Sequence, residues 1–128
     1  SRAYLQKFVH DYSNSSFLSK EEEQHYAIVC NADCSVVGDL SLFFSENDNC
    51  FTIGITIAPL FQKQGYAYEL LHEVIAQIQQ QHPSVDIVAL IEKENMHSIS
   101  LFKKLGFIEE CYAESIQSYV FTIFGKAD

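Results

Sequence analysis

The sequence lacks long uncharged apolar runs, internal repeats and low-complexity tracts, and it contains only two prolines. No stretch approaches the roughly 18 apolar residues that a membrane-spanning helix needs, so no membrane partner is expected. The opening residues, SRAYLQKFVHDYSN, include an Asp and a His without a long apolar run, unlike a secretory signal. Because no stretch has the composition of a linker, the 128 residues are predicted to form one soluble domain.

Basic residues are also scarce, since 8 Lys and Arg stand against 17 Asp and Glu for a net charge of −9. Lys and Arg drive the binding of phosphate backbones, so this balance argues against a nucleic-acid partner. The charge is compatible with a cationic substrate such as an amine. An acidic surface that serves only solubility is the stronger explanation.

Cysteine pairs with the two-residue spacing of a zinc knuckle or a redox site are absent. Cys30 and Cys34 flank the tripeptide NAD and could face each other across a hairpin. The alternative, which we favour, is that Cys30, Cys34, Cys50 and Cys111 are reduced and mostly buried thiols of a cytoplasmic protein.

The first half of the chain reads as a helix followed by strands. Residues 2–17 carry a weak helical pattern, and a second short helix could begin near Ser19. Runs of β-branched and aromatic residues bounded by short polar turns then predict three antiparallel strands, at 25–30, 35–44 and 50–58.

The second half alternates helices and strands. Helical periodicity over 67–78 ends before Pro83, and a nearly continuous apolar strand follows over 85–91. Asn95 is a plausible N-cap of the next helix, and Gly106 stands where a helix C-terminal glycine belongs. The last two strands are predicted at 107–112 and 116–124.

This order predicts an α+β fold: a single-domain, mixed, mostly antiparallel sheet with a central βαβ crossover over residues 50–91. The terminal strand, SYVFTIF, is apolar and could pair or pack across a homodimer interface.

The junction QKQGYAYELL at 62–71 joins the strand to the helix through Gly65. Such a turn combines unpaired N–H groups with the positive end of a helix dipole, and it suits pyrophosphate. A glycine lets phosphate approach the backbone closely. Taken alone, the pattern favours a tight turn that binds nothing.

A second segment, NMHSISLFKKLGF at 95–107, follows in the right order. Together, Q-x-x-G-x-A and N-x-x-S-x-x-L-F-x-K-L-G-F resemble the GNAT superfamily of acyl-CoA-dependent N-acyltransferases, closest to the ribosomal-protein N-terminal acetyltransferase-like subgroup. The resemblance covers about residues 24–124, which leaves 1–23 as an N-terminal helical segment of the 1–128 domain. Relatives generally begin with a strand, so the first strand is either missing from the domain or lost from this chain.

The resemblance implies acetyl-CoA as co-substrate and a V-shaped gap for its thioester between residues 55–58 and 88–91. The strand before the turn would pair with the pantetheine arm through Ile55, Thr56 and Ile57. Asn95 would contact this arm and Phe102 would pack beside it. Backbone donors for the pyrophosphate would come from Gln62, Lys63, Gln64, Gly65, Tyr66 and Ala67.

The implied reaction is direct attack of a primary amine, from a protein N-terminus or a small molecule, on the thioester in a ternary complex, with no metal. Many relatives have a tyrosine acid where this chain has Phe102, and Ser98 lies one helical turn earlier, so we expect Ser98 to donate the proton or anchor a water that does. A serine bonded to a local backbone group is the alternative. The sequence names no general base. The groups that could face the acceptor are Asp39, Glu92, Glu94 and Tyr112, whereas His97 reads as a surface residue.

Two other functions stay open. Phe102 and the unnamed base favour a non-catalytic acyl-CoA-binding regulatory module on the same fold. If the turn is only a turn, the domain is an interaction protein.

Overall fold

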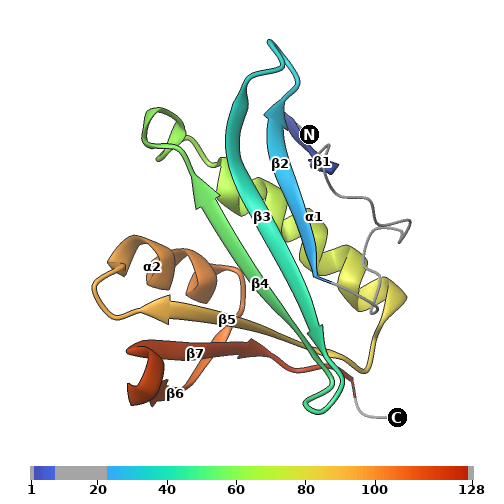
Figure 1. Cartoon of the computed structure of the whole chain (residues 1–128), viewed down its shortest axis with the longest axis vertical. Helices are drawn as coiled ribbons and strands as arrows, with labels where there is room; N and C mark the ends of the chain where they lie inside the picture. Colours follow the sequence, from blue (N-terminus) through green and yellow to red (C-terminus); the bar gives the residue numbers. More distant parts are fainter. Residues whose placement is uncertain (1, 8–22, 127–128) are drawn as a thin grey trace.

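The computed structural model describes residues 2–7 and 23–126. These residues form a seven-stranded sheet with strand order β1-β2-β3-β4-β5-β7-β6, together with two α-helices (Figure 1). The strands are β1 (Ala3–Lys7), β2 (Gln24–Cys30), β3 (Val36–Ser45), β4 (Cys50–Ile57), β5 (Asp86–Glu92), β6 (Ile108–Ala113) and β7 (Ser118–Ile123). The helices are α1 (Tyr66–Gln81) and α2 (Met96–Lys104), and single 3₁₀ turns occur at Pro59–Phe61 and Glu114–Ile116.

The sheet is mixed and mostly antiparallel, as predicted. Only β4 and β5 pair in parallel among the described strands, and α1 connects them. This unit is the βαβ crossover that the sequence indicated, with antiparallel strands on both sides of it.

Helix α1 covers one face of the sheet because its apolar residues recur at helical spacing. In Figure 1 it runs behind β2 and β3. Its buried side chains belong to the same core as Leu40 of β3 and Phe51 of β4. Each such side chain contributes about 1.5–3 kcal/mol when fully buried. The buried residues of α1 are Leu70, Leu71, Val74, Ile75 and Ile78.

Helix α2 begins and ends as its sequence predicts. The Asn95 side chain accepts a hydrogen bond from the backbone N–H of Ser98 at 3.2 Å, so Asn95 is the N-cap. Gly106 follows the helix with φ +100°, a conformation that glycine adopts without penalty. Neither described helix is both long and apolar enough to cross a membrane.

The prediction of helix at the start of the chain is wrong over residues 3–7, which form strand β1. Ala3 pairs with Cys30 and Lys7 with Tyr26, so β1 is an antiparallel edge strand beside β2. Its side chains alternate, since Ala3 is buried while Tyr4 is 42% exposed. The described sheet therefore has a strand before β2, and the suggestion that the first strand is missing is corrected. The rest of the predicted helical segment lies outside the described residues.

Two further expectations change. All four cysteines are free, but only Cys30 and Cys50 are buried, whereas Cys34 and Cys111 are exposed. The apolar strand β7 pairs with β5 on one side and β6 on the other, so it has no free edge with which to extend a sheet across an interface.

Candidate active site

The two parallel strands separate towards their C-terminal ends. Pairing between β4 and β5 covers only three positions, from Cys50 with Asp86 to Thr52 with Val88. Beyond this point β4 stays paired with β3 as far as Ile57, and β5 stays paired with β7 as far as Glu92. Figure 1 shows the two arrowheads diverging. The V-shaped gap expected between 55–58 and 88–91 is present, and the β4 backbone facing it has no partner among the described strands.

The turn that follows β4 exposes a run of backbone donors. Lys63 and Gly65 have positive φ angles of +63° and +84°. Among the described residues, none of the backbone N–H groups of residues 63–67 donates a hydrogen bond. Alternating left-handed residues gather N–H groups into an anion-binding concavity, and here that concavity coincides with the N-terminus of α1. A left-handed lysine is strained and is typical of functional turns.

Side-chain amides hold this turn in place. The amide nitrogen Nε2 of Gln62 donates to the Ile57 carbonyl at 2.9 Å, and Nε2 of Gln64 donates to the Leu60 carbonyl at 3.1 Å. Both side chains thus satisfy local carbonyls and leave the backbone N–H groups of the turn free. The Gln62 side chain therefore has a structural role in the turn that the sequence did not reveal.

A cavity of about 540 Å³ lies against the turn, the end of β4 and one face of α2, and we call it the turn cavity. Of the predicted cofactor-contacting residues, it brings together Ile55, Thr56, Ile57, Gln62, Lys63, Gly65, Tyr66, Ala67 and Asn95. Gln64 does not line it, and Phe102 lines the neighbouring cavity instead. The residues of its wall that sequence reasoning missed are Phe61, Tyr68, His97, Ser100, Leu101 and Lys104.

The residue spacing along α2 could have identified part of this wall from the sequence. His97, Leu101 and Lys104 follow one another at intervals of four and three residues, so they lie on one face of the helix. Lys104 is fixed at this wall, with its ammonium 5.1 Å from the ring centroid of Tyr68. Lys63 and Lys104 therefore add positive charge to the turn cavity.

A second cavity, of about 400 Å³, passes through the sheet between the diverging strands, and we call it the cross-sheet cavity. Part of its wall consists of Ile53, Ala89 and Ile91, which belong to the buried core shared with α1. Another part contains Asp39 and Thr56, which are paired neighbours on β3 and β4. Since alternate residues of a strand point to opposite faces, this cavity connects the two faces of the sheet.

The two cavities share four residues, so they meet in the gap. The shared residues are Ile55, Thr56, Asn95 and Ser98. Among the described residues, the Ser98 hydroxyl has no hydrogen-bond partner, because only the backbone N–H of Ser98 is engaged. The alternative of a hydroxyl satisfied by a local backbone group is therefore not what the structure contains. Ser98 is half-buried and faces both cavities.

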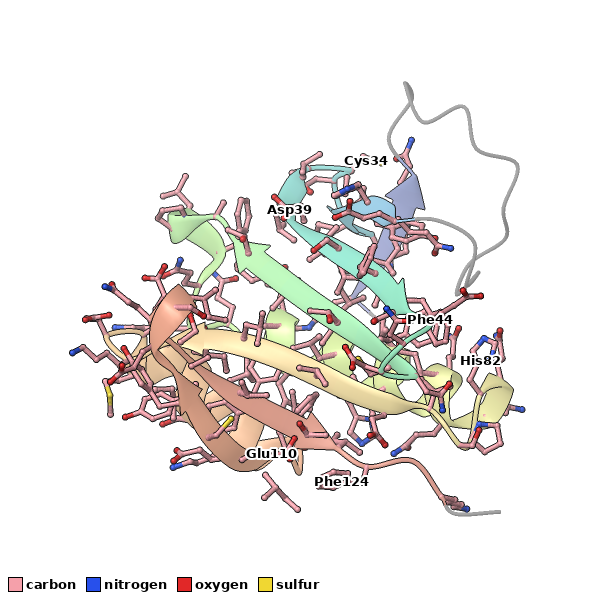
Figure 2. The ribbon with its side chains drawn as sticks, turned by 60° about the horizontal axis from the view of Figure 1, so that its bottom comes forward. Cys34, Asp39, Phe44, His82, Glu110 and Phe124 are labelled. Carbon is pink, nitrogen blue, oxygen red and sulfur yellow. The ribbon has the colours of Figure 1, made fainter. Side chains whose placement is uncertain are left out.

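Two carboxylates line the cross-sheet cavity, Asp39 and Glu92, and both are exposed. Figure 2 shows Asp39 on β3 near the end of β4. Neither carboxylate forms an ion pair among the described residues. Glu94 and Tyr112 line neither cavity, and His97 lines the turn cavity. The sequence did not place Asp39 at the cross-sheet cavity, because its pairing with Thr56 depends on strand register.

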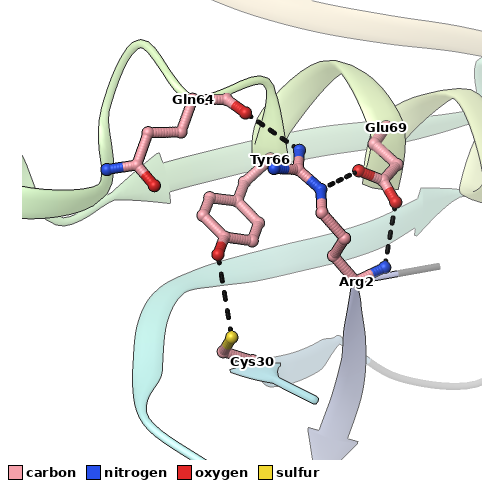
Figure 3. A network of polar contacts seen from close by, with 5 residues as sticks. All are labelled: Arg2, Cys30, Gln64, Tyr66 and Glu69. Atoms are coloured by element: carbon pink, nitrogen blue, oxygen red, sulfur yellow. Dashed lines mark hydrogen bonds and ion pairs between the residues drawn. The ribbon is translucent and has the colours of Figure 1, made fainter. Parts of the chain in front are cut away.

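The start of β1 is tied to the N-terminus of α1 (Figure 3). The backbone N–H and the guanidinium Nε of Arg2 donate to the Glu69 carboxylate at 2.9 and 2.7 Å. These bonds lower the pKa of Glu69, and its carboxylate raises the pKa of Arg2. The Tyr66 hydroxyl lies 3.7 Å from Cys30 Sγ, and this contact raises the pKa of Tyr66.

No group of three or more His, Cys, Asp or Glu residues in the described ranges is arranged to hold a metal ion. The polar side chains where the cavities meet are the Thr56 and Ser98 hydroxyls and the Asn95 amide, while the backbone N–H groups of the turn line one cavity and two carboxylates line the other. Such a set can bind an anion and transfer protons.

Solved structures share this fold at low sequence identity, and no curated protein sequence matches the chain. A candidate ribosomal-protein-serine acetyltransferase from Vibrio cholerae superposes with a TM-score of 0.72 at 20% identity, covering 80% of this chain. This chain spans 64% of the length of that protein. A chimera of the spermidine N-acetyltransferase SpeG from Vibrio cholerae and hSSAT gives a TM-score of 0.77 at 15% identity, covering 97% of this chain and 96% of the chimera. A GNAT-family acetyltransferase from Bacillus anthracis gives 0.68 at 18% identity, covering 78% of this chain and 65% of its own.

The family assignment rests on the sequence match. The family model described as acetyltransferase (GNAT) domain matches residues 1–108. Because this match covers most of the 128 residues and the fold agrees with it, the chain belongs to the acetyltransferase (GNAT) domain family.

Proposed function

We propose that this protein transfers an acetyl group from acetyl-CoA to a primary amine, on a small molecule or a protein N-terminus, by direct attack within a ternary complex. The observation that carries the proposal is the meeting of the turn cavity and the cross-sheet cavity in the gap between β4 and β5. One cavity offers anion-binding N–H groups and the other offers free carboxylates. A reaction between two bound substrates needs a binding site for each, and the two sites must adjoin where the reacting atoms meet.

The residues of the turn cavity fit acetyl-CoA. The free N–H groups of residues 63–67, with Lys63 and Lys104 nearby, suit a pyrophosphate. The unpaired edge of β4 beyond Thr52 can bind an extended amide-bearing arm as an added strand would. When bound, acetyl-CoA supplies an activated thioester carbonyl and a thiolate leaving group.

The protein's own residues then handle protons. The Ser98 hydroxyl is the proposed acid, because it is unpaired within the described structure and lies where both cavities meet. The incoming amine must lose a proton, and Asp39 and Glu92 are the carboxylates of the cross-sheet cavity that can accept it. Their negative charge also favours an acceptor that arrives as an ammonium ion.

The test is incubation with acetyl-CoA and a panel of primary amines that includes a polyamine and short peptides with free N-termini, with thiol release as readout. We expect amine-dependent thiol release, which Ser98→Ala lowers by about 10²–10⁴-fold, the range typical of general acid–base catalysis. Full activity of Ser98→Ala would remove the proposed acid. Binding of acetyl-CoA without turnover on any acceptor would count against the enzyme.

A non-catalytic acyl-CoA-binding module is the second candidate, and Phe102 favours it. Its phenyl ring has no proton to give, is only 3% exposed and packs edge-on against Phe107 at 5.0 Å. For this candidate, CoA should raise the melting temperature while thiol release stays at the rate of the uncatalysed reaction. A ligand at 100 times its dissociation constant adds about 2.7 kcal/mol of stability, so the binding is measurable without turnover.

Cytoplasmic location and a homodimer remain expectations. The four free thiols support a reducing compartment. Size-exclusion chromatography with light scattering would show whether the protein is a monomer or a dimer.

A further inference from the structure

The only arginine of the sequence, Arg2, lies near its start and reaches the anion-binding turn in the middle of the chain. One Nη nitrogen donates to the backbone carbonyl of Gln64 at 2.9 Å, across 62 positions of sequence. Its Nε is held by Glu69 at 2.7 Å, and its guanidinium carbon lies 4.5 Å from the ring centroid of Tyr66. Figure 3 shows Arg2 between Gln64 of the turn and Glu69 of α1, beside Tyr66. The guanidinium is thus fixed on three sides and satisfies a carbonyl of the turn.

The bond to Gln64 fixes the direction of the next N–H group. No described peptide bond is cis, so the carbonyl of Gln64 and the N–H of Gly65 point in opposite directions. Because Arg2 takes up the carbonyl, the N–H of Gly65 points away from Arg2. That N–H has no acceptor in the described structure and belongs to a residue that lines the turn cavity.

We propose that Arg2 is a positioning residue for the anion-binding turn, which it holds through the Gln64 carbonyl so that the Gly65 N–H is preset for phosphate. The inference rests on the proposed function, since it concerns the pyrophosphate part of the same site. Glu69 and Tyr66 fix the guanidinium, so strand β1 and the turn act as one unit. Preset donors bind an anion more tightly because binding no longer has to order them.

A simpler explanation is that Arg2 contributes only positive charge. The two explanations differ for lysine, which keeps the charge but lacks the planar fork that contacts Glu69 and Gln64 together. They also differ for Glu69→Gln, which removes a negative charge close to the turn. If Arg2 contributes only charge, Glu69→Gln should bind anions more tightly. If Arg2 positions the turn, Glu69→Gln should bind them more weakly, because the guanidinium loses the carboxylate that orients it.

The experiment measures dissociation constants for CoA by titration calorimetry with the full chain and four variants. These are Arg2→Ala, Arg2→Lys, Glu69→Gln and the charge control Lys93→Ala, which alters an exposed lysine outside both cavities. Inhibition of thiol release by pantetheine, which lacks the pyrophosphate, gives a second readout. Circular dichroism melts establish the temperature at which every variant is folded and can be compared.

We expect Arg2→Ala and Arg2→Lys each to weaken CoA binding about tenfold, the effect of losing one good hydrogen bond. Glu69→Gln should weaken CoA binding as well, while pantetheine inhibition and Lys93→Ala stay at wild-type values. Wild-type CoA affinity in Arg2→Lys, or tighter binding in Glu69→Gln, would overturn the positioning role. Equal losses for CoA and pantetheine would also overturn it, since they would indicate general destabilisation. Failure of the unmodified protein to bind CoA would instead reject the proposed function together with the inference.

Discussion

Replacing Gly65 with alanine should weaken CoA binding, whereas the same replacement at Gly106 should not. Both glycines have left-handed backbones, with φ +84° and +100°. An alanine in this conformation costs about 1–2 kcal/mol at either position. A Cβ atom added to Gly65 would lie 3.3 Å from an Nη nitrogen of Arg2, whereas one added to Gly106 would meet no atom of the described residues within 4 Å. Comparing the Gly65→Ala and Gly106→Ala variants thus separates the cost of backbone strain from an effect on CoA binding.

The magnitude follows from where the strain is released. If the turn of Gly65→Ala relaxes in the free protein, binding must restore the strained geometry and loses the same 1–2 kcal/mol, a factor of about 5–30 in the dissociation constant. Gly106 lies outside both cavities, so its strain appears only as lower stability. We therefore expect Gly106→Ala to lower the melting temperature by several degrees, at about 4 °C per kcal/mol for a domain of this size.

The assay is titration calorimetry with CoA at a temperature where both variants are fully folded, followed by thermal melts with and without CoA. The ligand-induced rise in melting temperature should shrink for Gly65→Ala and stay unchanged for Gly106→Ala. Equal dissociation constants in the two variants would refute the assignment of the Gly65 turn as the pyrophosphate site.

Three further outcomes are expected. Asp39→Asn should lower thiol release and move its pH dependence if Asp39 accepts the amine proton, while Asp48→Asn, on the distant β3–β4 turn, should leave the pH–rate profile unchanged. The Arg2 contacts lower the pKa of Glu69, so this carboxylate stabilises the fold above the ordinary glutamate pKa of about 4.3, and the contribution is lost as the pH falls through the lower folded value. Acid-unfolding curves of Glu69→Gln should therefore lack the loss of stability that protonation of Glu69 causes. Under native conditions a thiol reagent should label two cysteines quickly and two slowly, because burial protects two of them and raises the pKa of the Cys50 thiol. Mass spectrometry can follow the labelling of each cysteine. The fast pair should be Cys34 and Cys111, and fast labelling of Cys30 or Cys50 would contradict the packing.

The sequence by itself determined the features that depend on neighbouring residues. Helix α1 follows from its apolar spacing, and α2 starts at Asn95 and ends before Gly106 because a cap and a left-handed glycine act on adjacent peptide groups. The Gly65 turn was predicted as a concentration of free N–H groups for the same reason. Its partner motif at 95–107 indicated the family from local sequence alone.

Tertiary structure decided what depends on residues far apart in the chain. The pattern of β1 resembled a helix, but pairing with β2 made it a strand, since a ladder of hydrogen bonds to another strand outweighs weak local preference. The Arg2 bond to Gln64 spans 62 positions, and the pairing of Asp39 with Thr56 needs the register of β3 on β4. No local pattern encodes those distances, because chain folding alone brings such groups together.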